Sequence, residues 1–191
     1  MTTQFLIQAQ GLGALRGDRV LFRDLSFAAE PGDAIALRGA NGAGKSTLLR
    51  ILARLTRADA GSAEIADFHW AGHREGLKPA ETPRSHLRHW ATAWGADKHL
   101  IEDALVRMGL RRPADVPAKL LSAGQRRRTA LARLLLEKRP VWLLDEPYAA
   151  LDAEGRCLVE SLLSEHRDAG GAIAVAIHGE AGFEATKEVC L

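Results

Sequence analysis

The stretch GANGAGKS, residues 39–46, matches the pattern G-x-x-x-x-G-K-[ST]. An apolar run at residues 34–37 precedes it and predicts a strand, and the helical apolar spacing of STLLRILARL, residues 46–55, follows it. Glycines permit the positive φ angles that turn successive backbone N–H groups inward, and the start of the helix adds partial positive charge. The sequence therefore predicts a loop that holds phosphate groups.

This phosphate loop (residues 39–46) and the residue after it have expected tasks. We expect Lys45 to lie between the β- and γ-phosphates of ATP and the hydroxyl of Ser46 to ligate Mg²⁺. The alternative, a glycine-rich turn with a solvated lysine, is disfavoured by the strand before the loop and the helix after it. The residues expected to bind the nucleotide here are Gly39, Asn41, Gly42, Gly44, Lys45, Ser46 and Thr47.

Chemically active side chains also come at the ends of two later apolar runs. VWLLDE, residues 141–146, places Asp145 and Glu146 at the carboxyl end of a buried strand, where open α/β sheets bind their ligands. We expect Asp145 to support the Mg²⁺ shell and Glu146 to polarise the attacking water. His178 ends the run AIAVAIH, residues 172–178, and would hydrogen-bond the γ-phosphate and orient Glu146 or the water. The alternatives are an acidic pair that caps a helix, and a structural or solvated histidine.

The order of the predicted elements indicates an α/β fold. The first thirty residues alternate short apolar runs with turns and predict a small antiparallel β element. Strands then alternate with helices, which implies a mostly parallel core sheet of the P-loop NTPase kind. We expect one domain over residues 1–191, with its core at about 1–75 and 118–191 and a helical subdomain at about 76–117, where prolines punctuate helical runs.

The composition is that of an ordinary globular chain. Its 191 residues are 47% hydrophobic and 26% charged, with a formal net charge of +2. That charge is too small to demand nucleic acid or an anionic bilayer as a partner. The two cysteines match no metal-finger or disulfide pattern, and Cys157 is expected in the core. No apolar run approaches the roughly 18 residues of a membrane span, so we expect another chain to provide any membrane attachment.

The stretch LSAGQRRRTALARLLL, residues 121–136, starts as a small turn and continues as a helix. The Ser122 hydroxyl, the Gly124 N–H and the start of the helix all favour negative charge. Because the phosphate loop already provides one cradle, this second one suggests a phosphate that another chain holds. A serine that only caps a solvated helix is the alternative. In the first turn of the helix, we expect Arg127 or Arg128 to meet an acidic partner.

The chain carries a series of motifs in the order GANGAGKST, LSAGQ, VWLLDEP, ALD at residues 150–152 and His178. In kind and in order, they resemble the motifs of the ATPase subunits of ATP-binding cassette (ABC) transporters. The resemblance spans nearly the whole chain. In that family the signature of one subunit closes over the ATP held by the other, in a head-to-tail dimer with two ATPs. The resemblance implies that Ser122, Gly124 and Gln125 face the partner's γ-phosphate, that Asp152 lies in a dimer-interface loop, and that ATP and Mg²⁺ are bound.

Three positions depart from the family pattern, of which Ala123, in place of a signature glycine, should be tolerated if its φ is negative. Most relatives have a glutamine in the loop that enters the helical subdomain; this chain has His73, which could reach the metal or the attacking water. In place of the aromatic that stacks on adenine it has Arg16, which could stack on the base or stay exposed. Within the family, the short length and the stretch AGHREGLKPAETPRSHLRHW, residues 71–90, resemble the haem-exporter ATPases of cytochrome c biogenesis.

The resemblance implies an ATP-hydrolysing transport subunit, a translocase that energises haem export or delivery in cytochrome c biogenesis. Its partners would be a second copy of itself and integral membrane subunits, with no nucleic acid. It would be peripheral, on the cytoplasmic side of the inner (plasma) membrane. The alternatives are the ATPase of another small-substrate exporter, an ABC ATPase that acts on nucleic acid or ribosomes, a P-loop kinase, and a module that binds ATP without hydrolysing it.

Overall fold

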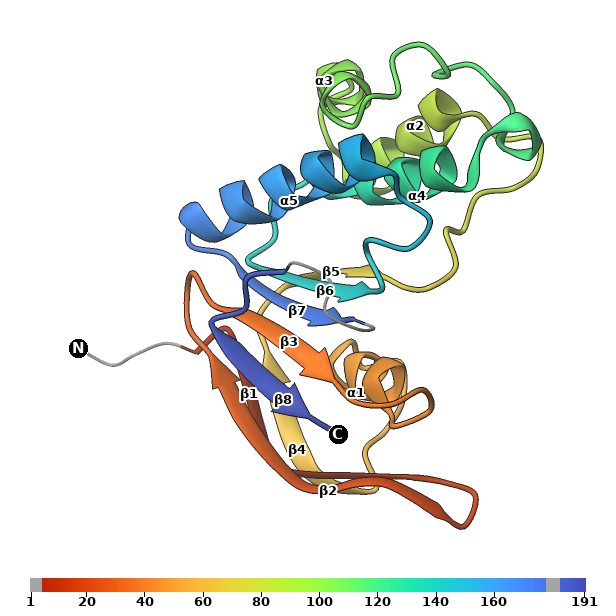
Figure 1. The fold of residues 1–191 in the computed structure, drawn as a ribbon. Coiled ribbons are helices and arrows are strands. Elements are labelled where there is room, and N and C mark those ends of the chain that lie inside the picture. The colour runs from red at the N-terminus through yellow and green to blue at the C-terminus, as the bar shows by residue number, and fades with distance from the viewer. Residues whose placement is uncertain (1–4, 178–182) are drawn as a thin grey trace. The chain divides into compact units, whose positions relative to one another are not determined.

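The computed structural model of the chain describes residues 5–177 and 183–191 and divides it into two compact units (Figure 1). The sheet unit comprises Met1–Gly72, Arg139–Glu146 and Leu163–Leu191. The helical unit comprises His73–Lys138 and Pro147–Leu162. Among the helices of the described residues, none combines the length and apolar character needed to cross a bilayer.

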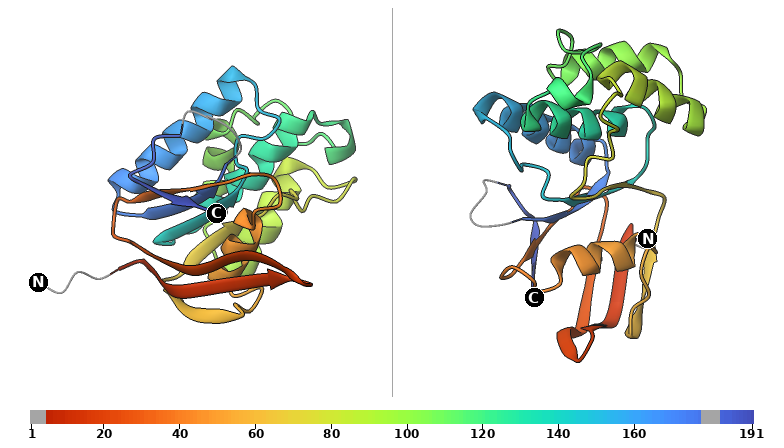
Figure 2. Two further views of the ribbon diagram at one scale, coloured as in Figure 1. Left: turned by 60° about the horizontal axis from the view of Figure 1, so that its bottom comes forward. Right: turned by 90° about the vertical axis from the view of Figure 1, so that its right-hand side faces the viewer.

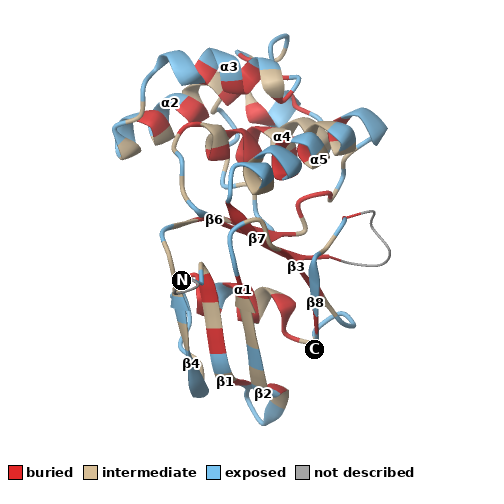
Figure 3. Cartoon of the chain, turned by 90° about the vertical axis from the view of Figure 1, so that its left-hand side faces the viewer, coloured by how far each residue is buried: buried red, intermediate tan, exposed pale blue. Residues whose placement is uncertain are grey.

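The centre of the sheet unit is a parallel five-stranded sheet in the order β5 (Phe68–Ala71), β6 (Val141–Asp145), β7 (Ala172–Ala176), β3 (Ala34–Arg38) and β8 (Lys187–Cys190). The middle strands β6, β7 and β3 are almost wholly buried (Figure 3), which explains why their sequences are continuous apolar runs. Parallel strands end at the same edge of their sheet. The phosphate loop after β3 and the acidic pair at the end of β6 therefore start from one edge, which confirms the predicted parallel core.

A second, antiparallel sheet has the order β2 (Arg19–Ala29), β1 (Ile7–Arg16) and β4 (Ala60–Ile65). It confirms the predicted antiparallel element at the start of the chain. Helix α1 (Lys45–Leu52) packs against β4 of this sheet and against β6 and β7 of the parallel sheet (Figure 2). Its buried Leu48, Leu49 and Leu52 join residues of both sheets in one hydrophobic core. The helix that begins at the phosphate loop is therefore fixed on both sides.

The helical unit contains α2 (Pro83–Trp94), α3 (His99–Arg107), the 3-10 turns η1 (Ala118–Leu120) and η2 (Arg133–Leu135), α4 (Ala123–Ala132) and the first part of α5 (Ala153–Asp168). The prediction that prolines lie at the ends of the helical runs is confirmed at α2, where Pro83 is the first residue after the capping residue Thr82. Gly95 ends this helix with a φ of 67°. The expectation for Cys157 is wrong: its side chain is exposed on α5. A small thiol on an amphipathic helix does not reveal from the sequence which face it occupies.

Candidate functional site

The phosphate loop is shaped by glycines that no other residue could replace without strain. Gly44 caps α1 with a φ of 113°, and a Cβ there would lie 3.1 Å from both Leu21 Cβ and Phe22 Cδ1. Gly39, with a φ of 144°, lies against the end of the chain, and its Cβ would be 2.7 Å from the carbonyl oxygen of Leu191. The loop is therefore packed closely at both ends, against the Leu191 main chain at Gly39 and against the side chains of Leu21 and Phe22 at Gly44.

The ammonium group of Lys45 is folded back over the entry of this loop. Its Nζ donates to the carbonyl oxygens of Gly39 at 2.6 Å and Ala40 at 3.1 Å, and the side chain is buried. An ammonium group has three donors, so one more acceptor can be bound where the loop closes. A buried cation beside a helix N-terminus is an electrostatic site for an anion.

Ser46 and Asp145 meet at the carboxyl edge of the sheet. The Ser46 hydroxyl donates to Asp145 Oδ1 at 3.0 Å, and Asp145 is almost fully buried. A hydroxyl and a carboxylate are the oxygen donors that Mg²⁺ prefers, and Mg²⁺ usually takes only one or two protein ligands beside phosphate oxygens. The chemistry of this pair fits the Mg²⁺ that the sequence predicts.

Glu146 has an unusual backbone for a residue with a side chain. Its φ is 54°, in the left-handed region, and its N–H donates to the carbonyl of Ala176 at 2.9 Å. A left-handed non-glycine residue costs about 1–3 kcal/mol and persists only when the surrounding structure enforces it. The bond to the end of β7 contributes to that enforcement, so the direction in which the Glu146 side chain leaves the main chain is set by the backbone of two strands.

The other residues predicted around the nucleotide occupy three different places. Thr47 is half-buried in the first turn of α1, and Asn41 and Gly42 are exposed in the loop. Arg16 is exposed at the end of β1, opposite Arg19 in the register with β2. His73 is exposed at the first position of the helical unit. His178 lies outside the described residues.

The residues of the signature turn (residues 121–125) form a reciprocal cap at the start of α4. Ser122 Oγ accepts from the Gln125 N–H at 3.1 Å, and Gln125 Oε1 accepts from the Ser122 N–H at 2.9 Å. Both side chains use acceptor oxygens for this cap. The Ser122 hydroxyl hydrogen and the Gln125 amide hydrogens are therefore donors left for an external anion.

A second contact joins the signature turn to the loop that precedes α5. A Cβ on Gly124 would lie 2.9 Å from the carbonyl oxygen of Ala150, whose φ is 60°. In the same loop, Asp152 Oδ1 accepts from the Gly155 N–H at 2.8 Å and so caps the first turn of α5. Gly124 is thus required by the close approach of two backbones, a reason the sequence alone did not provide.

The three arginines of α4 differ in their surroundings. Arg126 Nη1 donates to the Leu121 carbonyl at 2.6 Å, and Arg127 is 2% exposed. Arg128 Nη1 donates to the carbonyl of Met108 at 2.9 Å and to that of Gly109 at 3.4 Å. For Arg128 the expected acidic partner is therefore replaced by main-chain carbonyls at the end of a helix.

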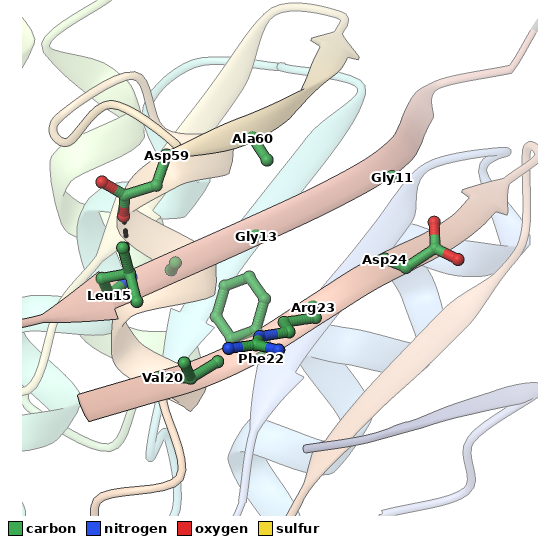
Figure 4. A pocket seen from close by; sticks show the side chains of 10 residues that line it. Gly11, Gly13, Leu15, Val20, Phe22, Arg23, Asp24, Asp59 and Ala60 are labelled. Carbon is green, nitrogen blue, oxygen red and sulfur yellow. Dashed lines mark hydrogen bonds between the residues drawn. The ribbon is translucent and has the colours of Figure 1, made fainter. Parts of the chain in front are cut away.

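A cavity of about 440 Å³ lies on the antiparallel sheet (Figure 4). Gly11 and Gly13 of β1 contribute no side chains to its floor, and Leu15, Val20 and Phe22 form its apolar wall. Asp59, on its rim, accepts from the Leu15 N–H at 2.7 Å, the bond drawn as a dashed line in Figure 4. The sequence did not reveal this cavity because it is lined by residues of β1 and β2 together with Asp59 and the first residue of β4, Ala60.

Comparisons with known proteins agree with these features. The family described as ABC transporter matches residues 22–149. A protein of Hyphomonas neptunium, cytochrome c biogenesis ATP-binding export protein CcmA, is 58% identical over 192 residues that cover 100% of this chain and 99% of the relative. The protein of the same name from Nitrobacter winogradskyi is 43% identical over 189 residues, 94% of each chain.

The fold is also similar to that of solved proteins. The structure of an ATP-binding subunit of an ABC transporter superposes with a TM-score of 0.81 at 24% sequence identity, covering 91% of this chain and 79% of that one. At this identity the likeness concerns the fold alone. It agrees with the parallel sheet, the antiparallel sheet and the helices described above.

Proposed function

This chain belongs to the ABC transporter family and is an ATP-binding, transport-coupled ATPase subunit, and we propose that it energises haem export or delivery in cytochrome c biogenesis. The observation that carries the ATPase mechanism is the hydrogen bond between Ser46 and Asp145 at the mouth of the phosphate loop. The bond supports the proposal because it joins two residues of the proposed nucleotide site that are 99 positions apart in sequence.

The phosphate loop is proposed to bind the phosphates of ATP. The amides of its helical end and the amine of Lys45 would contact the β- and γ-phosphates, since the first N–H groups of a helix have no partner within the helix. The nucleotide-contacting set is Gly39, Asn41, Gly42, Gly44, Lys45, Ser46 and Thr47. Arg16 is proposed to contact the base from the end of β1.

Ser46 and Asp145 would hold Mg²⁺, with His73 as a further candidate near the metal. When bound, Mg²⁺ neutralises charge on the phosphate oxygens. The chain's own contribution is the buried Asp145 carboxylate, which orients the Ser46 hydroxyl at the loop.

Glu146 is proposed to act on the attacking water. Its carboxylate would accept a proton from the water as the water oxygen bonds to the γ-phosphorus, while the bond from that phosphorus to the β,γ-bridging oxygen breaks and ADP leaves. The enforced backbone at Glu146 supports this role because it fixes, before ATP arrives, the direction in which the side chain leaves the main chain. His178 is proposed to hydrogen-bond the γ-phosphate and orient Glu146 or the water.

A second copy of the chain is proposed to complete each site. The donors of Ser122, Gly124 and Gln125 would contact the γ-phosphate held by the partner, with Asp152 in the interface between the two copies. The reciprocal cap supports this because it leaves donors available for an anion. ATP would therefore bring two copies together, and hydrolysis would allow them to part.

The relatives support the proposals for the cargo and the location. Two proteins at 58% and 43% identity carry the name of an export protein of cytochrome c biogenesis. An ATP-binding subunit of this family acts with membrane subunits, and we propose that this chain binds them peripherally on the cytoplasmic side of the inner membrane. Residues 76–117 would transmit the ATP cycle to those subunits.

Co-purification tests this proposal. A tagged chain extracted from membranes in mild detergent should bring integral membrane subunits with it, and those subunits reconstituted in liposomes should stimulate its ATPase. Lys45→Ala should abolish the stimulation without preventing co-purification. Isolation without any membrane subunit, together with stimulation by DNA or ribosomes, would contradict the transport assignment.

A further inference from the structure

Arg128 joins three helices of the helical unit. Its Nη1 donates to the carbonyls of Met108 and Gly109, the residues that follow the last turn of α3. A cation is stabilised at this end of a helix by the partial negative charge of the carbonyl groups. The stem of Arg128 packs against the first turn of α5, where a Cβ on Gly155 would lie 3.4 Å from Arg128 Cδ. Arg128 therefore ties α4 to the end of α3 and to the start of α5.

The residues proposed to act on the partner's nucleotide lie close to these contacts. Gly124 precedes Arg128 by four residues, so the two share one face of α4, and Gly124 touches the main chain at Ala150. Asp152 caps the turn of α5 against which Arg128 packs, through its bond to Gly155. The signature turn and Asp152 are thus parts of one packed arrangement. Arg128 belongs to it twice, because it lies on the helix that follows the signature turn and packs against the turn of α5 that Asp152 caps.

The fit of this side chain is specific to arginine. Two glycines make room for it: a Cβ at Gly109 would lie 2.5 Å from Arg128 Nη1, and Gly155 is buried against its stem. Both bonds come from Nη1, whose two hydrogens lie in the plane of the guanidinium and can serve two neighbouring carbonyls. Lysine would keep the charge but lose that geometry.

We propose that Arg128 is a positioning residue for the shared ATP site. It holds the signature turn and the loop of Asp152 in a fixed relation, so that both reach the partner's nucleotide together. The inference rests on the proposed two-chain site. Arg128 acts through Ser122 and Asp152 and not on the nucleotide itself.

Paired chains with two different tags test the idea. All chains carry Glu146→Gln, which blocks hydrolysis, and capture of one tag by the other is measured in saturating ATP. Lys45→Ala disables a chain's own phosphate loop, and Ser122→Arg disables its signature. A chain with Lys45→Ala is mixed with a chain that carries Ser122→Arg. In the mixed dimer, the intact loop of the second chain faces the intact signature of the first, so one complete site remains. The two chains should therefore associate with each other, although neither associates with itself. This pair is the positive control.

Arg128→Met should behave like Ser122→Arg. Its self-association should weaken at least about tenfold, a difference of about 1.4 kcal/mol. Mixed with the Lys45→Ala chain, it should associate as well as the positive control; mixed with the Ser122→Arg chain, it should not associate. Arg128→Lys should recover part of the self-association.

Other outcomes separate the possible failures. If the positive control does not associate while the chain with Glu146→Gln alone does, the shared site of the proposed function is wrong. If the positive control associates and both Arg128→Met mixtures fail, the substitution only damages the fold, and the positioning role is overturned. If Arg128→Met self-associates like its parent, Arg128 has no positioning role.

Discussion

The Ser46 hydroxyl donates a hydrogen bond of 3.0 Å to the carboxylate of Asp145, from the first turn of α1 to the end of β6. The bond pre-arranges two oxygen donors where the proposed metal site lies. Ser46→Ala and Asp145→Asn should each raise the Mg²⁺ concentration that gives half-maximal ATP hydrolysis by at least about tenfold. Titration of Mg²⁺ at fixed ATP measures this, with Ser62→Ala on the exposed part of β4 as the control. An unchanged Mg²⁺ requirement in both variants would remove this pair from the metal site.

Gly39 is predicted to be sensitive to substitution for a reason beyond its backbone angle. An alanine there would be strained by its φ of 144° and would also meet the Leu191 carbonyl at 2.7 Å. Gly39→Ala should lower the free energy of unfolding by about 1–3 kcal/mol and weaken ATP binding. Gly17, with a φ of 60° and open space around it, is the matched control: Gly17→Ala should cost about 1–2 kcal/mol from its backbone angle alone, and Gly39→Ala should cost more because it adds the contact with Leu191. Urea denaturation compares the two; equal costs would contradict the packing argument.

Ser122 has two separable tasks, a cap within its own chain and a donor for a second chain. Ser122→Asp preserves the cap, because a carboxylate also accepts from the Gln125 N–H, but it places negative charge where a phosphate is proposed to bind. Stability should therefore remain close to that of the parent while ATP-dependent association is lost. Ser122→Ala should lower stability by about 1 kcal/mol. Should Ser122→Asp associate normally, the turn does not face a phosphate.

His86 makes the stability of the helical unit depend on pH. Its ring is buried between Glu81, 3.2 Å from Nδ1, and Trp90, whose Nε1 donates to His86 Nε2 at 3.1 Å. Burial lowers the pKa of His86, the carboxylate of Glu81 only partly opposing it. The unfolded chain therefore takes up the proton first, and stability should fall as the pH drops below about 6.5, by at most about 1.4 kcal/mol per pH unit for this group.

Chemical denaturation between pH 7.5 and pH 5 measures that slope, within the range where His titrates. His86→Gln should flatten it, and His89→Gln, at an exposed position of the same helix, should not. Burial also lowers the pKa of His166 in the sheet unit, so part of the slope should persist in the His86 variant. Superimposable slopes for the parent and the His86 variant would show that His86 does not titrate on unfolding.

The sequence predicted the elements that are long or wholly buried. The runs that become β3, β6 and β7 are apolar throughout, and the phosphate loop has a pattern that few other structures require. β4, β5 and β8 were not predicted. Of the four residues of β8 only Val189 is buried, and its pairing with β3 depends on a strand 150 residues away in sequence.

The geometry of the site was less accessible to sequence reasoning than its residues. The left-handed backbone of Glu146 and Ala150 could not be predicted, because residues with side chains rarely adopt it. The partners of Arg128 were also not predictable, since main-chain carbonyls at the end of another helix have no sequence pattern. The sequence motifs identify the residues that bind and react, whereas the tertiary structure determines which main-chain atoms hold those residues in place.

The central claim is that ATP joins two copies of this chain through a shared site, and sedimentation of the Glu146→Gln variant tests it most directly. With ATP the variant should sediment as a dimer, and with ADP as a monomer. Adding Ser122→Arg to the same chain should return it to a monomer in ATP. A Glu146→Gln chain that binds ATP and yet remains monomeric at saturating nucleotide would contradict the claim.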